Sequence, residues 1–94
     1  MSLRFEWDPD KAATNERKHG VTFAEASTAF RDPHSISVPD PDHSIAEARW
    51  LLLGISKPGR LLVVAHTERR DTVRIINARL ATRHERKIYE EDQA

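Results

Sequence analysis

A group of cations beside a phenol, in the last quarter of the chain, has the residue types and the spacing to do chemistry. Residues 72–80 have the period-two pattern of a strand, in which Arg74, Ile76, Ala78 and Leu80 alternate with Val73, Ile75, Asn77 and Arg79. Thr82 and Glu85 then have the spacing of a capping box, so we expect a helix to begin directly after this strand. Guanidinium groups beside a phenol suit a phosphate ligand, because planar donors match its oxygens. Strand and helix together bring Arg79, Arg83, Arg86 and Tyr89 into one small region.

A carboxylate, an imidazole and a guanidinium follow one another in the middle of the chain. His43 precedes a strand predicted at residues 47–56, and Glu47 and Arg49 share one face of that strand. Within reach of each other, these three groups could transfer protons beside a phosphate. The alternative is an ion pair at the end of a sheet with a histidine in the adjoining loop, and such a pair contributes little when it is exposed.

Two other positions carry cations with either a functional or a structural interpretation. Arg60 is the first residue of the strand predicted at residues 60–67, where a solvent-exposed side chain is the structural interpretation. In the functional interpretation, Arg60 converges with Arg79 and the two hold phosphate oxygens. Lys18 and His19 stand where a helix should end, and the helix dipole alone favours both there. No pair among the five histidines has the spacing of a helical zinc motif, and the chain has no cysteine, so we expect no metal and no cofactor.

The net charge of zero conceals an uneven distribution along the chain. Residues 1–56 contain six Lys/Arg and nine Asp/Glu, residues 57–87 contain nine and three, and the last residues add three carboxylates. The three segments therefore carry charges of −3, +6 and −3. A locally basic segment can attract a polyanion although the whole molecule is neutral. Alternatively, its cations pair with the acidic N-terminal half.

Several signals along the chain predict the elements that must position these side chains. Asp8-Pro9 is typical of a helix start, and Gly20 is typical of a helix end. Thr22 and Glu25 have the spacing of another capping box, which predicts a helix up to the Asp32-Pro33 pair. The expected strands are residues 3–7, 34–38, 47–56, 60–67 and 72–80.

These elements predict one α+β domain over residues 1–94, with two N-terminal helices, one C-terminal helix and an antiparallel sheet of about four strands. Trp7 and Trp50 are expected in the core. Trp50 should face the helices, which leaves the opposite face of the sheet open for a ligand. The chain has no apolar run of membrane-spanning length and no signal-peptide pattern at its N-terminus, so we expect a bacterial-type cytoplasmic protein.

A set of short motifs is spread over nearly the whole chain. They are Phe5-Glu-Trp-Asp-Pro-Asp-Lys-Ala12, Asn15, Lys18-His-Gly-Val-Thr-Phe-Ala-Glu-Ala26, Phe30-Arg-Asp-Pro33, His43-Ser44, Glu47, Arg49, Gly54, Gly59-Arg-Leu-Leu-Val-Val64, Thr67-Glu68, Arg74-Ile-Ile76, Ala78-Arg79, Ala81-Thr82, Glu85 and Tyr89. In this order the motifs resemble those of the BrnT toxins of bacterial type II toxin–antitoxin modules, whose fold looks like that of the RelE-type ribonucleases. One small departure is Asn77, where the family commonly has Ser.

The resemblance implies cleavage of RNA without a metal ion. It also implies neutralisation by an adjacently encoded, BrnA-like antitoxin with a ribbon-helix-helix DNA-binding part. The pair would bind its own promoter, so that operator DNA is contacted only through the antitoxin, and no membrane is involved.

Our interpretation is therefore an endoribonuclease in which the 2′-hydroxyl of one nucleotide attacks the neighbouring phosphorus. Arg60 and Arg79 would stabilise the charge that develops. Glu47 and His43 are the candidate base and acid, and Tyr89 is a second candidate donor. The alternative is a non-catalytic module that binds nucleic acid or a partner on the same fold. The further candidate RNA-binding residues are Arg49, Arg74, Arg83 and Lys18.

Overall fold

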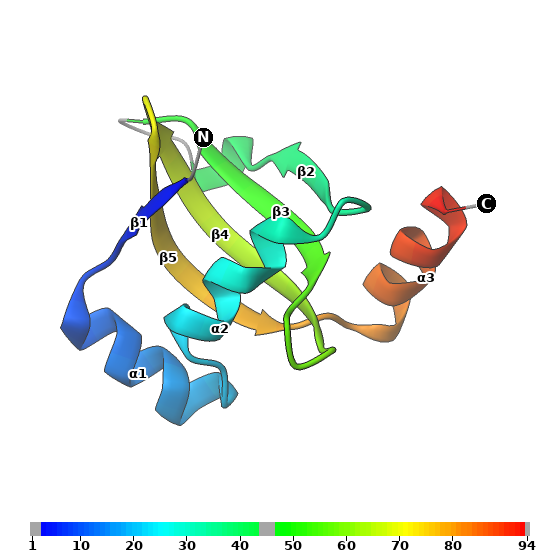
Figure 1. Cartoon of the computed structure of the whole chain (residues 1–94), viewed down its shortest axis with the longest axis horizontal. Coiled ribbons are helices and arrows are strands. Elements are labelled where there is room, and N and C mark those ends of the chain that lie inside the picture. The colour runs from blue at the N-terminus through cyan, green and yellow to red at the C-terminus, as the bar shows by residue number, and fades with distance from the viewer. Residues whose placement is uncertain (1–2, 44–46, 94) are drawn as a thin grey trace.

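The fold is a mixed five-stranded sheet with two helices on one face and a third helix at its end (Figure 1). The structure is a computed structural model, and it describes residues 3–43 and 47–93. Ser44, one of the residues that carry the resemblance, lies outside this part. The elements are β1 (Arg4–Glu6), α1 (Pro9–His19), α2 (Phe23–Thr28), the 3-10 turn η1 (Ala29–Arg31), β2 (Ile36–Pro39), the 3-10 turn η2 (Pro41–His43), β3 (Arg49–Ile55), β4 (Leu61–Arg69), β5 (Thr72–Leu80) and α3 (Arg83–Asp92).

The sheet order is β1-β5-β4-β3-β2, and only the β1–β5 pair is parallel. The expected α+β class is confirmed, but the expectation of about four antiparallel strands is wrong. The three residues of β1 pair with the outer edge of β5, which covers hydrogen-bonding groups that an edge strand would otherwise expose. Past the end of β1, the same edge of β5 is covered by a side chain instead of a strand.

That side chain is Asn15 in α1, which acts as a short substitute for a strand. Its amide nitrogen donates to the carbonyl oxygens of Ala78 (2.8 Å) and Val21 (2.9 Å), and its oxygen accepts from the Ala78 amide at 3.1 Å. Only 5% of Asn15 is exposed. The carboxamide therefore holds α1 against β5 at a fixed rotation and height.

Helix ends follow the local sequence signals in most cases. Asp8 caps α1, Gly20 ends it in the left-handed conformation (φ 68°), and the capping box of Thr82 and Glu85 at α3 is confirmed. The expected capping box at α2 is only half formed. Thr22 accepts from the Glu25 amide at 3.0 Å, but the Glu25 carboxylate turns to Arg60 and leaves the helix start. The ion pair is the stronger interaction for a partly buried carboxylate.

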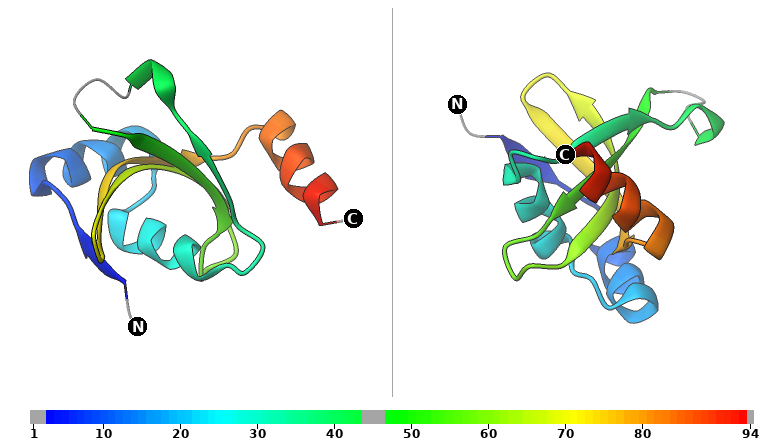
Figure 2. Two further views of the ribbon diagram at one scale, coloured as in Figure 1. Left: turned by 90° about the horizontal axis from the view of Figure 1, so that it is seen from above. Right: turned by 90° about the vertical axis from the view of Figure 1, so that its right-hand side faces the viewer.

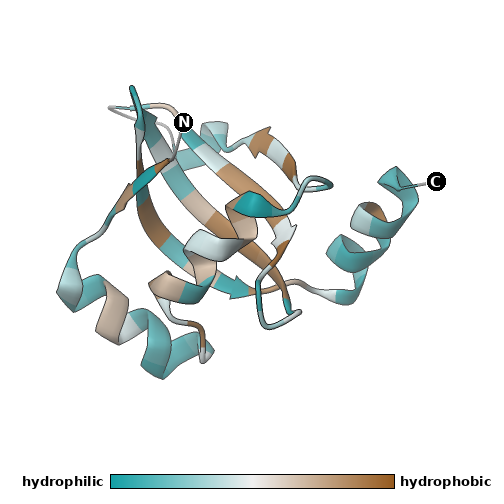
Figure 3. Cartoon of the chain, viewed as in Figure 1, coloured by the Kyte–Doolittle hydropathy of each residue, from teal (hydrophilic) through white to brown (hydrophobic). Residues whose placement is uncertain are grey.

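The core lies between the sheet and the pair of helices α1 and α2, where the sheet curls around α2 (Figure 2). Trp7 and Phe30 pack against it from its margin. Apolar colour follows the central strands, whereas α3 is mostly hydrophilic (Figure 3). The fully buried members are Val21, Phe23, Ala26, Ala29, Leu52, Leu62, Val64, Val73, Ile75 and Ala78. No helix in the described part of the chain is long and apolar enough to cross a bilayer.

Candidate functional site

The sheet face opposite α1 and α2, which we call the open face, collects most of the chemically interesting side chains. Alternation along β4 points Leu62, Val64 and His66 to the core, so their neighbours point the other way. Trp50 lies opposite His66 and therefore on the helix-covered face. The cations on the open face are Arg49 from β3, Arg69 from β4, and Arg74 and Arg79 from β5.

A β-bulge decides that Arg74 and Arg79 share this face. They are five positions apart, so strict alternation would place them on opposite faces, as the sequence pattern predicts. In the structure Ile75 pairs with His66 and Asn77 pairs with Ala65, which leaves Ile76 as the extra residue of a bulge. Arg74 and Asn77 both point to the open face as a result.

A carboxylate and two guanidinium groups meet at one end of the open face. Glu47 accepts from Arg69 Nε at 2.8 Å and from Arg69 Nη2 at 2.9 Å. The Arg69 hydrogen bonds, reinforced by the charge of Arg74, hold the pKa of Glu47 below its usual value, so Glu47 is ionised at neutral pH. Arg74 donates to Glu6 of β1 at 3.0 Å. Sequence reasoning missed Arg69, although the register of the β3–β4 hairpin places it opposite Glu47.

His43 and Arg49 converge on a second carboxylate, Asp40. His43 Nδ1 lies 3.1 Å and 3.2 Å from the two Asp40 oxygens, and Arg49 Nε lies 4.0 Å from one of them. The His43 side chain is 64% exposed, and Nδ1 is the ring atom that faces Asp40. Nε2 therefore remains available to a substrate. The sequence interpretation grouped His43 with Arg49 correctly but overlooked Asp40 as their common partner.

Arg79 lies toward the other end of the open face and is held by α3. Its two terminal nitrogens donate to Glu85 at 2.7 Å and 2.9 Å. These hydrogen bonds outweigh burial, and with the capping contacts to Thr82 they lower the pKa of Glu85 to about 2. Arg74 pairs with Thr67 of β4, and Arg79 pairs with Val63, four residues earlier in that strand. The Cα atoms of the two arginines are therefore about 13 Å apart along the strands.

Arg60 does not converge with Arg79, contrary to the expectation from sequence. It precedes Leu61 and therefore points to the helix-covered face, where it pairs with the Glu25 carboxylate. It also donates to the Gly20 carbonyl oxygen at 3.0 Å. Arg60 thus ties β4 to α2 and to the end of α1. Together with the Glu6–Arg74 and Glu47–Arg69 pairs, this contact shows the basic segment pairing with the acidic N-terminal half.

Tyr89 is also separated from Arg79, because it anchors the far end of α3. Its hydroxyl donates to Asp32 at 2.5 Å, and the residue is only 7% exposed. Burial, with the hydrogen bond to Asp32, raises the pKa of Tyr89 to about 12, so the phenol stays protonated at neutral pH. Arg83 and Arg86 are exposed on α3. Lys18 lies on α1 beside β5, in a groove at the β5 edge of the open face.

The open face also has an apolar section between its two charged ends. A groove of about 170 Å³ lies between the β2–β3–β4 section and α3, and it is lined by Ile, Leu and Val side chains together with Glu85. Two of its members are unusually exposed for their type, Val38 at 45% and Ile88 at 44%. Within the described residues, no three His, Cys, Asp or Glu side chains gather closely enough to hold a metal ion.

Comparison with solved structures finds a similar fold. The 1.1 Å crystal structure of the Brucella abortus ribonuclease toxin BrnT matches with a TM-score of 0.67 and 21% sequence identity, over 87% of this chain and 100% of that chain. At this identity the match establishes the fold. Comparison with curated protein sequences gave no match.

The sequence itself establishes the family. The profile described as "Ribonuclease toxin, BrnT, of type II toxin-antitoxin system" matches residues 7–85. The chain belongs to the BrnT family of ribonuclease toxins. Membership implies an RNA substrate and an antitoxin partner.

Proposed function

We propose that this protein is a metal-independent endoribonuclease toxin of the cytoplasm, that it inhibits translation and growth, and that its RNA lies across the open face. The observation that carries the proposal is the placement of Arg49, Arg69, Arg74 and Arg79 on one sheet face that α1 and α2 leave uncovered. Four guanidinium groups on one face suit a chain of phosphates. A carboxylate and an imidazole stand at the edge of the same face.

The reaction is an internal transesterification. The 2′-oxygen attacks the adjacent phosphorus and loses its proton to a base, the phosphorane carries extra negative charge, and the 5′-oxygen leaves after it gains a proton from an acid. A 2′,3′-cyclic phosphate and a 5′-hydroxyl result. Negative charge develops on the phosphorane oxygens in the transition state. Hydrogen-bond donors aimed at these oxygens therefore lower the activation barrier.

We assign the base to Glu47, the acid to His43, and charge stabilisation to Arg74 and Arg79. Glu47 becomes a better base when phosphate oxygens take Arg69 away from it, because this hydrogen bond keeps its pKa low. Arg49 and Arg83 would contact neighbouring parts of the RNA, whereas Arg60 and Tyr89 support the fold.

We also propose that the antitoxin is a BrnA-like ribbon-helix-helix protein that covers the open face. The apolar groove beside α3 would receive apolar antitoxin residues, and the flanking arginines would attract acidic ones. The toxin–antitoxin complex would then bind operator DNA through the antitoxin and repress its own operon.

The test is RNA cleavage by the purified protein in excess EDTA, with identification of the product ends. We expect full activity and a 2′,3′-cyclic phosphate or its hydrolysis product. Glu47→Gln should lower kcat by about 10²-fold or more, in the range for a positioned proton-transfer group, while Lys57→Ala in the β3–β4 turn serves as the control. Loss of activity in EDTA, restored by a divalent ion, would contradict the mechanism. RNA binding without cleavage would favour the non-catalytic alternative.

A further inference from the structure

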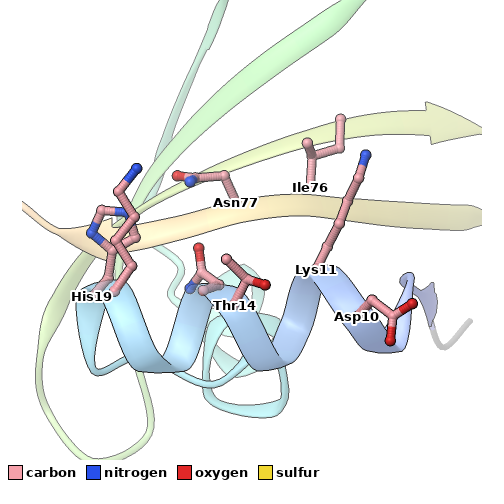
Figure 4. Close-up of a pocket in the computed structure, with 8 residues that line it drawn as sticks. Asp10, Lys11, Thr14, His19, Ile76 and Asn77 are labelled. Atoms are coloured by element: carbon pink, nitrogen blue, oxygen red, sulfur yellow. The ribbon is translucent and has the colours of Figure 1, made fainter.

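A second cationic groove lies at the β5 edge of the open face, between α1 and β5, and has a volume of about 300 Å³ (Figure 4). Lys11, Lys18 and His19 line it from the helix, and Ile76 and Asn77 line it from the strand. In Figure 4 the Lys11 side chain extends from α1 up past Ile76, and Asn77 lies on the other side of Ile76 and points toward the His19 end of α1. The roles proposed above leave this groove without a function.

Fixed contacts build the groove. Lys11 and Lys18 are four positions before and three positions after Asn15, so all three share one stripe of α1. Asn15 is bound to Ala78 of β5, which fixes the rotation of α1 and holds both lysines beside the strand. The bulge at Ile76 turns Asn77 outward at the same level.

The charge of the groove differs from that of the open face. Arg69, Arg74 and Arg79 each pair with a carboxylate. Neither Lys11 nor Lys18 forms an ion pair with any residue in the described part of the chain, and both are exposed. The groove's own carboxylate, Asp10, stands at the N-terminal end of α1, where the helix dipole favours it. The groove thus keeps an excess of positive charge.

We propose that this groove binds a backbone phosphate of the RNA next to the reacting one. Lysine ammonium groups act as point charges that suit phosphate oxygens, and they carry no base specificity. Asn77 lies on the same face of β5 as Arg79 and two positions before it, so about 7 Å separates their Cα atoms. One nucleotide step of a single strand can therefore link the groove to the open face. The inference rests on the proposed function, because it gives the substrate a second point of attachment.

The test compares wild type, the Lys11→Gln/Lys18→Gln double variant and the Lys57→Gln control. Glutamine keeps a similar stem and removes only the charge. The probe is a fluorescent single-stranded RNA with 2′-O-methyl sugars, which cannot be cleaved, and binding is measured by anisotropy from about 50 to 300 mM salt. We expect the double variant to bind RNA more weakly. The slope of log K against log salt concentration should become shallower by about 1. In cleavage, KM should rise while kcat is retained, and Lys11→Arg/Lys18→Arg should restore binding.

Two outcomes separate this inference from the proposed function. Unchanged RNA affinity, salt slope and KM in the double variant would overturn the proposal that the groove binds RNA, and would leave the proposed function intact. A double variant that loses antitoxin binding but keeps its RNA binding would overturn it in the same way. If wild type cleaves no RNA but the double variant still weakens salt-sensitive binding, the proposed function fails and the phosphate groove stands.

Discussion

Arg79 shows how a single residue serves both the fold and the proposed chemistry. In the free protein its guanidinium is occupied by Glu85, so a phosphate must compete with that carboxylate to bind. The same holds for Arg74 with Glu6 and for Arg69 with Glu47. Such carboxylates keep the arginines ordered and make the face selective for ligands of high negative charge.

We predict that Arg79→Ala abolishes toxicity while the protein stays folded. Removing one donor to the charged transition state typically lowers kcat by about 10²–10³-fold. The measurement is single-turnover cleavage of RNA, with circular dichroism to confirm the fold and Lys57→Ala as the comparison. Equal cleavage by wild type and a folded Arg79→Ala protein would remove Arg79 from the mechanism.

Asn15 is the residue whose loss should most affect the edge of the sheet. Asn15→Leu leaves the amide and carbonyl of Ala78 and the carbonyl of Val21 without their present partner. We expect the free energy of unfolding to fall by about 2–4 kcal/mol, because buried backbone groups would be left unsatisfied. Urea denaturation measures it, with exposed Glu16→Gln as the control. A change below about 0.5 kcal/mol, the usual limit for surface substitutions, would show that water or a strand shift replaces the carboxamide.

At the scale of elements, α3 is attached to the body mainly by side chains. Glu85 binds Arg79 near its start, Tyr89 binds Asp32 near its end, and Gln93 donates to the His34 carbonyl oxygen at 3.4 Å. Its remaining surface is largely hydrophilic (Figure 3). The position of α3, and with it the shape of the apolar groove, therefore depends on a few polar contacts.

The Glu85 contact predicts a pH-dependent part of the stability. The folded-state pKa of Glu85 is about 2, below the ordinary value of 4.5, so its contribution is complete above about pH 4.5 and is lost as pH falls toward 2. Glu85→Gln keeps the capping hydrogen bond and removes the charge. We expect wild type to be more stable than the variant by about 1–2 kcal/mol at pH 6, after allowance for partial exposure, and this difference to vanish near pH 2.

Urea unfolding of both proteins at several pH values measures this difference. His84→Gln, an exposed neighbour on α3, controls for changes in the helix itself. A difference between wild type and Glu85→Gln that stays constant from pH 6 to about pH 2 would mean that the ion pair with Arg79 adds nothing to stability.

For the whole molecule, the neutral net charge hides an uneven distribution of charge, because a basic segment follows an acidic N-terminal half. The acidic half neutralises three arginines through Glu6, Glu25 and Glu47, whereas Lys11 and Lys18 form no ion pair within the described part of the chain. A partner that masks the open face must match both the arginines and the apolar groove. Burying an arginine there without a partner would cost several kcal/mol.

We predict that association with the antitoxin slows as salt rises. Exposed charges are screened beyond roughly 10 Å at 0.1 M, so electrostatic steering weakens. A stopped-flow series between about 50 and 500 mM salt measures the on-rate for wild type, Arg79→Ala and the Lys57→Ala control. We expect the steepest fall for wild type and weaker binding for Arg79→Ala. An on-rate independent of salt, with unchanged affinity in Arg79→Ala, would place the antitoxin on another surface.

The local sequence determined much of this architecture. Asp8-Pro9, Gly20 and the Thr82–Glu85 box identify helix ends, because capping uses groups only two or three residues apart. Alternation identifies strands for the same reason. The stretches shared with the BrnT toxins indicated the family, which the profile match over residues 7–85 establishes.

Only the tertiary structure decided which of these residues meet. The parallel pairing of β1, the Asn15 bridge to Ala78 and the Arg60–Glu25 pair join residues 35 to 68 positions apart, and no local pattern encodes them. The bulge at Ile76 reverses the face of every later residue in β5, and it depends on how β4 and β5 pair. For that reason the sequence could identify Arg74 and Arg79 as candidates but could not place them on one face, and it could not reveal that Arg60 points away from both.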